Sequence, residues 1–544
     1  MAISLAEACV SSTFSGVSFF GGEILAIDTN LVTKFSASVN EAFRMSQPSV
    51  ELKDATFCNV TVTYTHPGQN DDIKVETWLP VDNWNGRLQA TGGGGWSAGR
   101  FFLSYEAMKG AIADGYATVT TDAGLGWESV PKDWALLSPG NLNIFNIQNL
   151  GTVSLGDQSL IGKAAVKAFY GKGPEYSYFS GCSQGGRQAM SVAQRYPDAY
   201  DGIFAGAPAI EWPQLFGAAN WPQQYMEMTG QFPYGCELDA IEDAAIAACD
   251  GLDGLVDGII TELDACLETF DPFKEVGKKI DCAEAKGKIK ITKAAAAVTN
   301  ATWHGWRTVD GREKYYGMTP GTDLTGHQNN MLPVAVAVAM TNCTVGTCRG
   351  QKIDALSMNA WWTHFIARDP EFDTTSFTHA EFDELLRISI EMYKGFLSAN
   401  DPDLTGFRNA GGKLISAHGL WDGIIPSKAT EAYYNAVAAE LPDVDSFYRH
   451  YQIPGLGHCW GRQSGSPTSA FEQLRAWVEN GTAPEHMPIK VMDKEGALTQ
   501  ERILCPFPQK AAFDKKCGDS GAEKCWSCVG KAKGGSKKTL HDEI

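Results

Sequence analysis

The chain has 544 residues, of which 44% are hydrophobic and 20% charged, so a globular protein with a large core is expected, and the length suggests more than one domain. A formal net charge of −19 and a pI near 5.0 disfavour nucleic acid and acidic polymers as partners, because like charges repel. The apolar run Met331–Met340 is too short to cross a bilayer, so no membrane partner is expected.

The N-terminal part of the chain predicts a sheet with flanking helices. Polar and apolar residues alternate over Val50–Val81, which predicts antiparallel strands. Apolar segments then predict buried strands at Arg87–Thr91, Ala117–Thr121, Tyr176–Ser180 and Ile203–Ala205, and helices are expected at Ile161–Tyr170 and Arg187–Tyr196. This order is typical of a mostly parallel sheet with helices on its faces, an α/β fold.

The regular order of strands and helices stops at Pro208 and returns at Lys413. The intervening residues are rich in Trp, Asp and Cys, so we interpret 209–410 as an inserted lid domain and 1–208 with 411–544 as one α/β domain. Strands are expected at Lys413–Ala417 and Ser446–Ile453, and helices at Ser427–Glu440 and Ser469–Glu479.

A candidate nucleophile lies between a predicted strand and a predicted helix. The segment Gly181-Cys182-Ser183-Gln184-Gly185 has the pattern Gly-x-Ser-x-Gly, which in this context is typical of the nucleophile turn of an α/β-hydrolase. Such a turn exposes the Ser183 hydroxyl and leaves the Gln184 N–H at a helix start, where it can bind an oxyanion. A chance glycine-rich turn is the ordinary alternative, and the flanking strand and helix disfavour it.

The remaining members of a catalytic triad follow in the order that this fold class uses, which is Ser, acid and His. Asp422 lies in a glycine-flanked loop after one predicted strand, and His458 lies in a glycine-rich loop after the next. We expect His458 to act as the base and Asp422 to orient it. Two other histidines compete: His418 is only four residues from Asp422, and His450 falls within a predicted strand and is expected to be structural.

Two cysteines flank the candidate triad. Cys182 directly precedes Ser183, and Cys459 directly follows His458. Because Ser and His side chains of a triad must meet, their neighbours can approach the Cα separation of roughly 5.5–6 Å that a disulfide needs. We therefore expect a Cys182–Cys459 bridge; pairing with other cysteines, or Cys182 as nucleophile, are the alternatives.

Cys182-Ser183, Asp422 and His458-Cys459 together resemble the CS-D-HC motif of the tannase/feruloyl esterase family, and the resemblance extends from about Cys9 to Cys528. It implies an α/β-hydrolase domain, a lid domain that carries calcium, and hydrolysis of aromatic carboxylic esters through an acyl-enzyme. It also gives the glycine run after Thr91 a role as the second oxyanion loop, with Gly94 or Gly95 beside Gln184.

The segment from Cys249 to Ile259 places three aspartates among glycines, and hard cations bind several carboxylate and carbonyl oxygens. An acidic surface turn is the ordinary alternative. The family resemblance implies a structural calcium ion, a Cys249–Cys266 bridge that closes the loop, and five ligands: the side chains of Asp250, Asp253 and Asp257 and the carbonyls of Leu255 and Ile259.

The 14 cysteines indicate an oxidising compartment, so a secreted, extracellular protein is expected. Further expected pairs are Cys9–Cys58, Cys343–Cys348 and Cys505–Cys528, while Cys236, Cys282, Cys517 and Cys525 have no assigned partners. Candidate glycosylation sites are Asn59, Asn300, Asn342 and Asn480. Met1–Val10 lacks a basic segment followed by a long apolar one, which is typical of a mature chain after removal of a signal peptide.

The resemblance implies a secreted serine esterase that releases hydroxycinnamic acids of the ferulic type from plant cell-wall esters. Its partner would be a small aromatic ester or a feruloylated saccharide. A tannase, which hydrolyses galloyl esters, shares every motif above and is the first alternative. An inactive binding relative is the alternative from another class, and a peptidase on the same fold is a third. The sequence does not indicate an oligomeric state.

Overall fold

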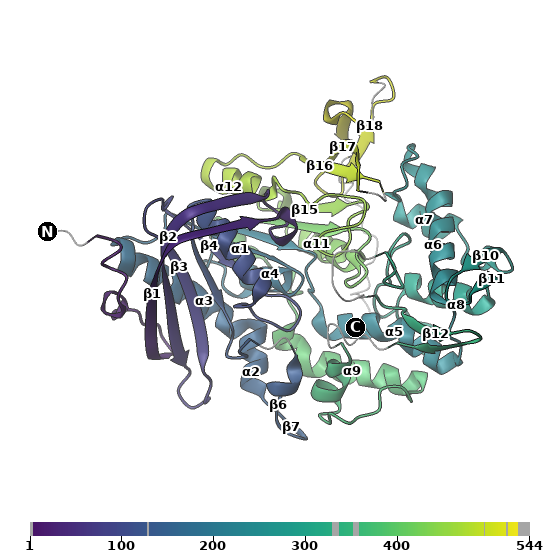
Figure 1. The fold of residues 1–544 in the computed structure, drawn as a ribbon, viewed down its shortest axis with the longest axis horizontal. Helices are drawn as coiled ribbons and strands as arrows, with labels where there is room; N and C mark the ends of the chain where they lie inside the picture. Colours follow the sequence, from purple (N-terminus) through teal and green to yellow (C-terminus); the bar gives the residue numbers. More distant parts are fainter. Residues whose placement is uncertain are drawn as a thin grey trace.

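A nine-stranded sheet organises the protein, with strand order β1-β2-β3-β5-β4-β8-β9-β14-β15 (Figure 1). The structure is a computed structural model that describes residues 4–127, 130–328, 337–351, 358–493, 496–517 and 521–530. Most of Met331–Met340 lies outside these residues, and no helix within them is long and apolar enough to cross a membrane.

The sheet confirms the α/β-hydrolase prediction. Its strands are β1 (Glu23–Val39), β2 (Val50–Thr65), β3 (Ile73–Pro80), β4 (Arg87–Thr91), β5 (Ala117–Thr121), β8 (Tyr176–Cys182), β9 (Gly202–Gly206), β14 (Lys413–Gly419) and β15 (Tyr448–Ile453). Pairing is antiparallel from β1 through β3 to β5, and parallel from β5 through β4 to β15. The strand β1 has no counterpart among the predicted strands.

Helices cover both faces of the sheet because successive strand residues point to opposite sides. In β8, Tyr178 packs in a core with residues of α1 (Phe102–Ala113) and α12 (Ala470–Asn480). The next residue, Phe179, packs in another core with residues of α3 (Ser154–Tyr170), α4 (Gln184–Arg195) and α11 (Ser427–Glu440). The short elements β6 (Leu136–Ser138), β7 (Asn141–Leu142) and α2 (Ile144–Gln148) precede α3.

Between β9 and β14 the described chain adds no strand to this sheet. It forms the helices α5 (Trp212–Thr229), α6 (Gly235–Cys249), α7 (Leu263–Thr269), α8 (Lys293–His304), α9 (His379–Leu397) and α10 (Thr405–Asn409), with the hairpins β10 (Lys279–Cys282) to β11 (Gly287–Lys290) and β12 (Thr341–Thr344) to β13 (Thr347–Gly350). Its buried rings stack with Trp96 of the glycine-rich loop, whose ring centroid lies 4.9 Å from that of Phe216 and 5.0 Å from that of Phe365. The inserted segment therefore packs directly on a loop of the sheet.

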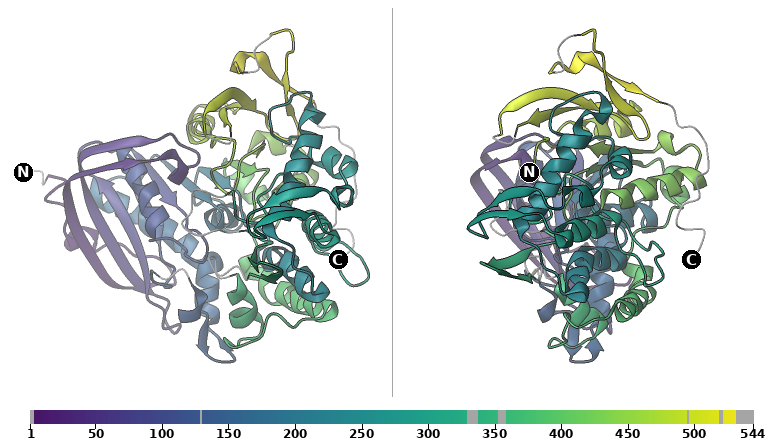
Figure 2. Two further views of the ribbon diagram at one scale, coloured as in Figure 1. Left: turned by 45° about the vertical axis from the view of Figure 1, so that its right-hand side comes forward. Right: turned by 90° about the vertical axis from the view of Figure 1, so that its right-hand side faces the viewer.

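The C-terminal part of the chain forms two small hairpins that project from the rest of the molecule (Figure 2, yellow). They are β16 (Met487–Met492) with β17 (Leu498–Leu504), and β18 (Lys510–Phe513) with β19 (Trp526–Val529). Leu255 of the inserted segment packs against their small core, which includes Ile503 and Trp526. This contact joins the hairpins to the aspartate-containing segment from Cys249 to Ile259, here called the acidic loop.

All 14 cysteines are paired in seven disulfides. The five expected pairs are present, namely Cys9–Cys58, Cys182–Cys459, Cys249–Cys266, Cys343–Cys348 and Cys505–Cys528. The four unassigned cysteines pair as Cys236–Cys282 and Cys517–Cys525.

The four candidate glycosylation sites differ in their surroundings. Asn59 lies in β2, which is paired on both edges, and its Nδ2 donates to the buried Glu76 Oε1 at 2.9 Å. A glycan on that nitrogen would require this hydrogen bond to break. Asn59 and Asn300 are partly exposed and Asn342 and Asn480 are exposed, so all four sites remain predictions.

Candidate active site

Ser183 forms a strained turn between β8 and α4. Its backbone angles are φ 63° and ψ −121°, and its N–H donates to Gly206 O at 3.0 Å. A Cβ on Gly181 would lie 2.6 Å from the Gly185 carbonyl, so strand and helix can approach this closely only through glycine. The local sequence therefore produces the expected nucleophile turn, with Ser183 partly exposed at its apex.

Asp422 and His458 form a hydrogen-bonded pair. The Nδ1–H of His458 donates to Asp422 Oδ2 at 2.7 Å, while the N–H groups of Ile424 and Ile425 donate to Oδ1 at 2.8 and 2.9 Å. Asp422 is only 2% exposed. Burial alone would raise the pKa of Asp422, but His458 and His418 hold that pKa well below its usual value. The carboxylate stays ionised and can orient His458.

His418 also binds Asp422. Its Nε2 lies 3.1 Å from Asp422 Oδ2, and its Nδ1 lies 2.7 Å from Thr430 Oγ1. The side chain is fully buried, so His418 cannot reach a substrate and is not the base. His450 is buried in β15, where burial lowers its pKa to about 3, and its Nδ1 lies 2.9 Å from Ser416 Oγ.

The bridge between Cys182 and Cys459 brings the nucleophile loop beside the base loop, with a Cα separation of 6.1 Å. As a disulfide, Cys182 has no thiolate and cannot be the nucleophile. No hydrogen bond joins Ser183 Oγ to His458 among the described residues. Such bonds are often long or poorly aligned before substrate binds.

The glycine-rich loop narrows the choice of a second oxyanion donor. The Gly93 N–H donates to Gln188 Oε1 at 2.7 Å, and the Gly94 N–H donates to Ser97 O at 3.1 Å. Gly94 is therefore wrong as an oxyanion donor, because its N–H already closes a turn. Within the described chain the N–H groups of Gln184 and Gly95 have no hydrogen-bond acceptor, and a Cβ added at Gly95, whose φ is +56°, would meet no atom within 4 Å. These two amides remain candidates.

The acidic loop carries oxygen donors suited to calcium, and the side chain of Arg502 lies beside it. Asp250 accepts the N–H groups of Asp257, Gly258 and Ile259, and Asp253 accepts that of Leu255, so the loop curls around its first carboxylate.

The guanidinium of Arg502 from β17 forms an ion pair with Asp257, and both side chains are nearly buried. The carboxylates of Asp250, Asp253 and Asp257 are not gathered around one point in this arrangement. The chemistry of the donor set fits calcium, and Arg502 supplies a positive charge at the loop.

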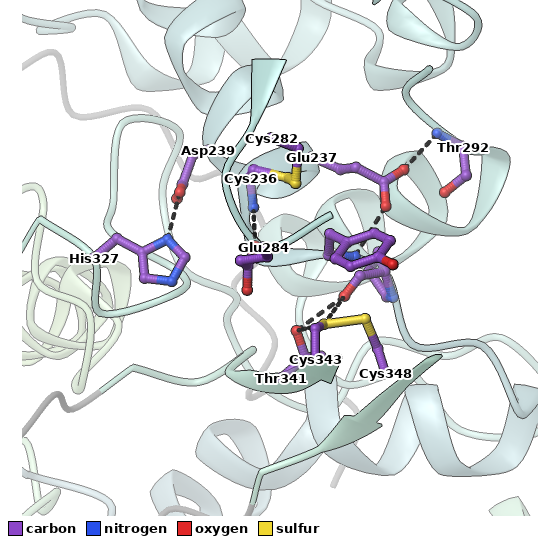
Figure 3. The surroundings of a disulfide bond; sticks show 12 residues. Cys236, Glu237, Asp239, Cys282, Glu284, Thr292, His327, Thr341, Cys343 and Cys348 are labelled. Carbon is purple, nitrogen blue, oxygen red and sulfur yellow. Dashed lines mark hydrogen bonds and ion pairs between the residues drawn. A yellow bond between two sulfur atoms is a disulfide. The ribbon is translucent and has the colours of Figure 1, made fainter. Parts of the chain in front are cut away.

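Another cluster with metal-ligand chemistry surrounds the Cys236–Cys282 disulfide (Figure 3). Both sulfurs are bonded to each other, and Glu284 Oε2 accepts the Cys236 N–H at 3.0 Å. The nearby His327 donates through Nδ1 to Asp239 Oδ2 at 2.7 Å. With its thiols oxidised, this cluster offers no thiolate ligand and serves as a structural link.

A family model, a curated relative and solved structures all relate this chain to tannases and feruloyl esterases. The family described as "Tannase and feruloyl esterase" matches residues 58–529. A protein of Arthroderma benhamiae named "Probable feruloyl esterase" is 37% identical over 491 residues, covering 89% of this chain and 87% of that protein. The tannin acyl hydrolase structure from Aspergillus niger has a TM-score of 0.83 at 29% identity, covering 97% of this chain and 96% of its own. The feruloyl esterase B structure from Aspergillus oryzae, with a TM-score of 0.76 at 24% identity, covers 97% of this chain and 100% of its own and shares the fold.

Proposed function

Because the chain belongs to the tannase and feruloyl esterase family and is a carboxylic ester hydrolase, we propose that it is a serine esterase that releases hydroxycinnamic acids of the ferulic type from plant cell-wall esters. The observation that carries the serine mechanism is the disulfide that places the loop of Ser183 beside that of His458. The relative at 37% identity, named a probable feruloyl esterase, favours ferulate over gallate. Galloyl esters are the second candidate, favoured by the tannin acyl hydrolase structure at 29% identity.

The reaction proceeds through an acyl-enzyme. His458 Nε2 takes the proton of Ser183 Oγ, which attacks the ester carbonyl, while Asp422 stabilises the imidazolium. The N–H groups of Gln184 and Gly95 receive the oxyanion, and one such donor is typically worth ~3 kcal/mol of barrier. The imidazolium then protonates the leaving alcohol. Water repeats these steps on the acyl-enzyme and releases the phenolic acid.

The acidic loop holds calcium in this proposal, through the side chains of Asp250, Asp253 and Asp257 and the carbonyls of Leu255 and Ile259. Calcium supplies positive charge that neutralises the carboxylates and orders the loop. Arg502 must leave Asp257 when the ion binds. No step of ester hydrolysis uses the ion.

The protein acts outside the cell in this proposal. Seven disulfides with no free cysteine are typical of an oxidising compartment. The exposed sequons at Asn342 and Asn480 are compatible with glycosylation there.

Hydrolysis of methyl ferulate, methyl caffeate and methyl gallate by the purified protein tests the substrate assignment, with Ser183→Ala as control. We expect the ferulate and caffeate esters to have the highest kcat/KM and the Ser183→Ala variant to be inactive. Preference for methyl gallate would make the protein a tannase. Failure of a serine-directed fluorophosphonate to label Ser183, with no ester hydrolysed, would indicate an inactive relative.

A further inference from the structure

Arg187 is a buried cation without an acid. It lies in the first turns of α4, is 0% exposed, and donates to neutral oxygens only. Its Nε donates to Gln184 Oε1 at 2.6 Å, Nη1 to Gly151 O at 2.8 Å and Leu397 O at 3.3 Å, and Nη2 to Leu150 O at 2.9 Å. No carboxylate of the described chain is within ion-pair distance of its guanidinium. Burial lowers the pKa of Arg187 to about 9, so the group stays charged at neutral pH.

The same residue holds both parts of the nucleophile turn. The backbone N–H of Arg187 donates to Ser183 O at 2.9 Å, and its side chain donates to the neighbouring Gln184. The guanidinium also lies 4.9 Å from the centre of the Trp212 ring. The Arg187 side chain therefore links Gln184 to the start of the inserted segment, while its contact with Ser183 is the backbone hydrogen bond of α4.

Carbonyl groups, one of them at the C-terminal end of α9, carry only partial negative charges and compensate the guanidinium in part. A buried ion is costly when no opposite charge compensates it, and neutral side chains of similar length also fill such a site. Arg195, which is also positive, lowers the pKa of Arg187 further. The remaining positive charge adds to the positive end of α4, where the Gln184 N–H would bind the oxyanion of the proposed mechanism.

We propose that Arg187 is the positioning residue of the oxyanion hole, which anchors Gln184 and places a fixed positive charge behind its N–H. The proposal rests on the serine esterase mechanism above. Because negative charge on the carbonyl oxygen develops only on the way to the transition state, Arg187 acts on kcat rather than on substrate binding.

The test compares Arg187→Met, Arg187→Lys and the matched control Arg195→Met. Arg195 lies on the same helix and also donates to carbonyls at the end of α9, to Gly395 O at 2.9 Å and Ser398 O at 3.4 Å, but it contacts neither Ser183 nor Gln184. With 4-nitrophenyl acetate, we expect Arg187→Met to lower kcat about 10- to 100-fold with KM changed less than about threefold. Arg187→Lys should recover part of the loss, and Arg195→Met should keep wild-type kcat.

An arylboronic acid, which forms a tetrahedral adduct with Ser183, separates transition-state stabilisation from general damage. Its affinity should fall in parallel with kcat in Arg187→Met, while the affinity for the free phenolic acid stays within about threefold of wild type. Equal losses for both ligands, or wild-type kcat in a folded Arg187→Met protein, would overturn the proposal.

If Arg187→Met does not fold, Gln184→Ala keeps the backbone N–H and the charge but removes the anchor. It should lower kcat and boronate affinity together by about 3- to 10-fold, and unchanged values would overturn the anchoring role. A wild-type protein that hydrolyses no ester fails the proposed function instead, and the boronate affinities of the variants still decide the role of Arg187.

Discussion

His418 and His458 share one oxygen of Asp422: His458 Nδ1 lies 2.7 Å and His418 Nε2 lies 3.1 Å from Oδ2. Only His458 reaches the surface, since 17% of its side chain is exposed and none of that of His418. The two histidines therefore have separate tasks: His458 faces the substrate, whereas His418 only helps to hold Asp422 in place.

His418→Leu should lower kcat about 10- to 100-fold with little change in KM, because Asp422 loses a donor that fixes its orientation. Steady-state kinetics on methyl ferulate measures this. His450→Leu is the matched control, since His450 is equally buried in the adjacent strand and bonds to Ser416 rather than to Asp422. A full kcat in folded His418→Leu would contradict the assigned task.

Thermal stability should fall between about pH 6.5 and 9 through the loss of one buried charge. Hydrogen bonds to Asp157 and Asp71, at 3.2 and 2.7 Å, raise the pKa of His66 to about 9 despite burial, and Tyr64 and Asn149 complete this cluster. A raised folded-state pKa stabilises below the unfolded value of about 6.5, and this contribution, up to about 3 kcal/mol, disappears as pH rises through 9.

The variant His66→Gln should be less stable than wild type at pH 6 and should lose most of this pH dependence in calorimetry. His486→Gln is the control, because His486 is about half exposed. If the thermal stability of wild type and of His66→Gln declined in parallel from about pH 6.5 to 9, a group other than His66 would cause the pH dependence.

Removal of the Cys182–Cys459 bridge by a double substitution to alanine should reduce both activity and stability. The bridge spans 277 residues, and closure of so long a loop stabilises the fold by up to about 5 kcal/mol. We expect kcat to fall at least about tenfold, since the loops of Ser183 and His458 are no longer tied. Removal of Cys343–Cys348, which spans 5 residues, should cost less stability and leave kcat unchanged. Comparable kinetic losses in both double variants would contradict a role for the bridge in the triad.

Calcium should raise the thermal midpoint by roughly 3–8 °C over the EGTA-treated protein, because the ion binds the folded loop only. Arg502→Met should increase this gain, since it removes the cation that holds Asp257. Asp250→Asn should abolish it. Asp264→Asn, at an exposed acid on α7 that pairs with Lys428, should behave like wild type. If metal analysis finds no bound calcium and EGTA does not change the thermal midpoint, Arg502 alone compensates the negative charge of the loop.

The sequence predicts elements well where the signal is local. The segments of β4 and α11 match their predicted bounds, since β4 is a short strand buried along nearly its whole length and the buried residues of α11 recur at helical spacing. The long strand β1 escaped prediction because nearly all of its residues are exposed or only partly buried, which leaves no clear apolar face.

Site residues that act through distant partners could not be predicted. Arg187 bonds to Gln184 three residues away, but its burial depends on the distant carbonyls of Leu150 and Leu397. Arg502 pairs with the distant Asp257, so the sequence around these arginines does not indicate their roles. Gly94 and Gly95 could not be distinguished either, because the difference is the turn that the Gly94 N–H closes with Ser97. A shared motif predicts the chemistry, whereas the supporting contacts require the fold.

The pairing of β9 with β14 has a consequence for the evolution of this protein. The two strands are parallel and Gly202 is aligned with Lys413, so the chain leaves the sheet after Gly206, at one end of β9, and re-enters it at Lys413, at the opposite end of the neighbouring strand, ~13 Å back along the strand direction. Everything between those points can lengthen, shrink or be exchanged as a cassette without pulling the hydrolytic groups apart. This arrangement allows new acyl specificities to evolve while the catalytic residues are retained. It makes Ala207 and Lys413 suitable junctions for grafting the corresponding segment of a related protein.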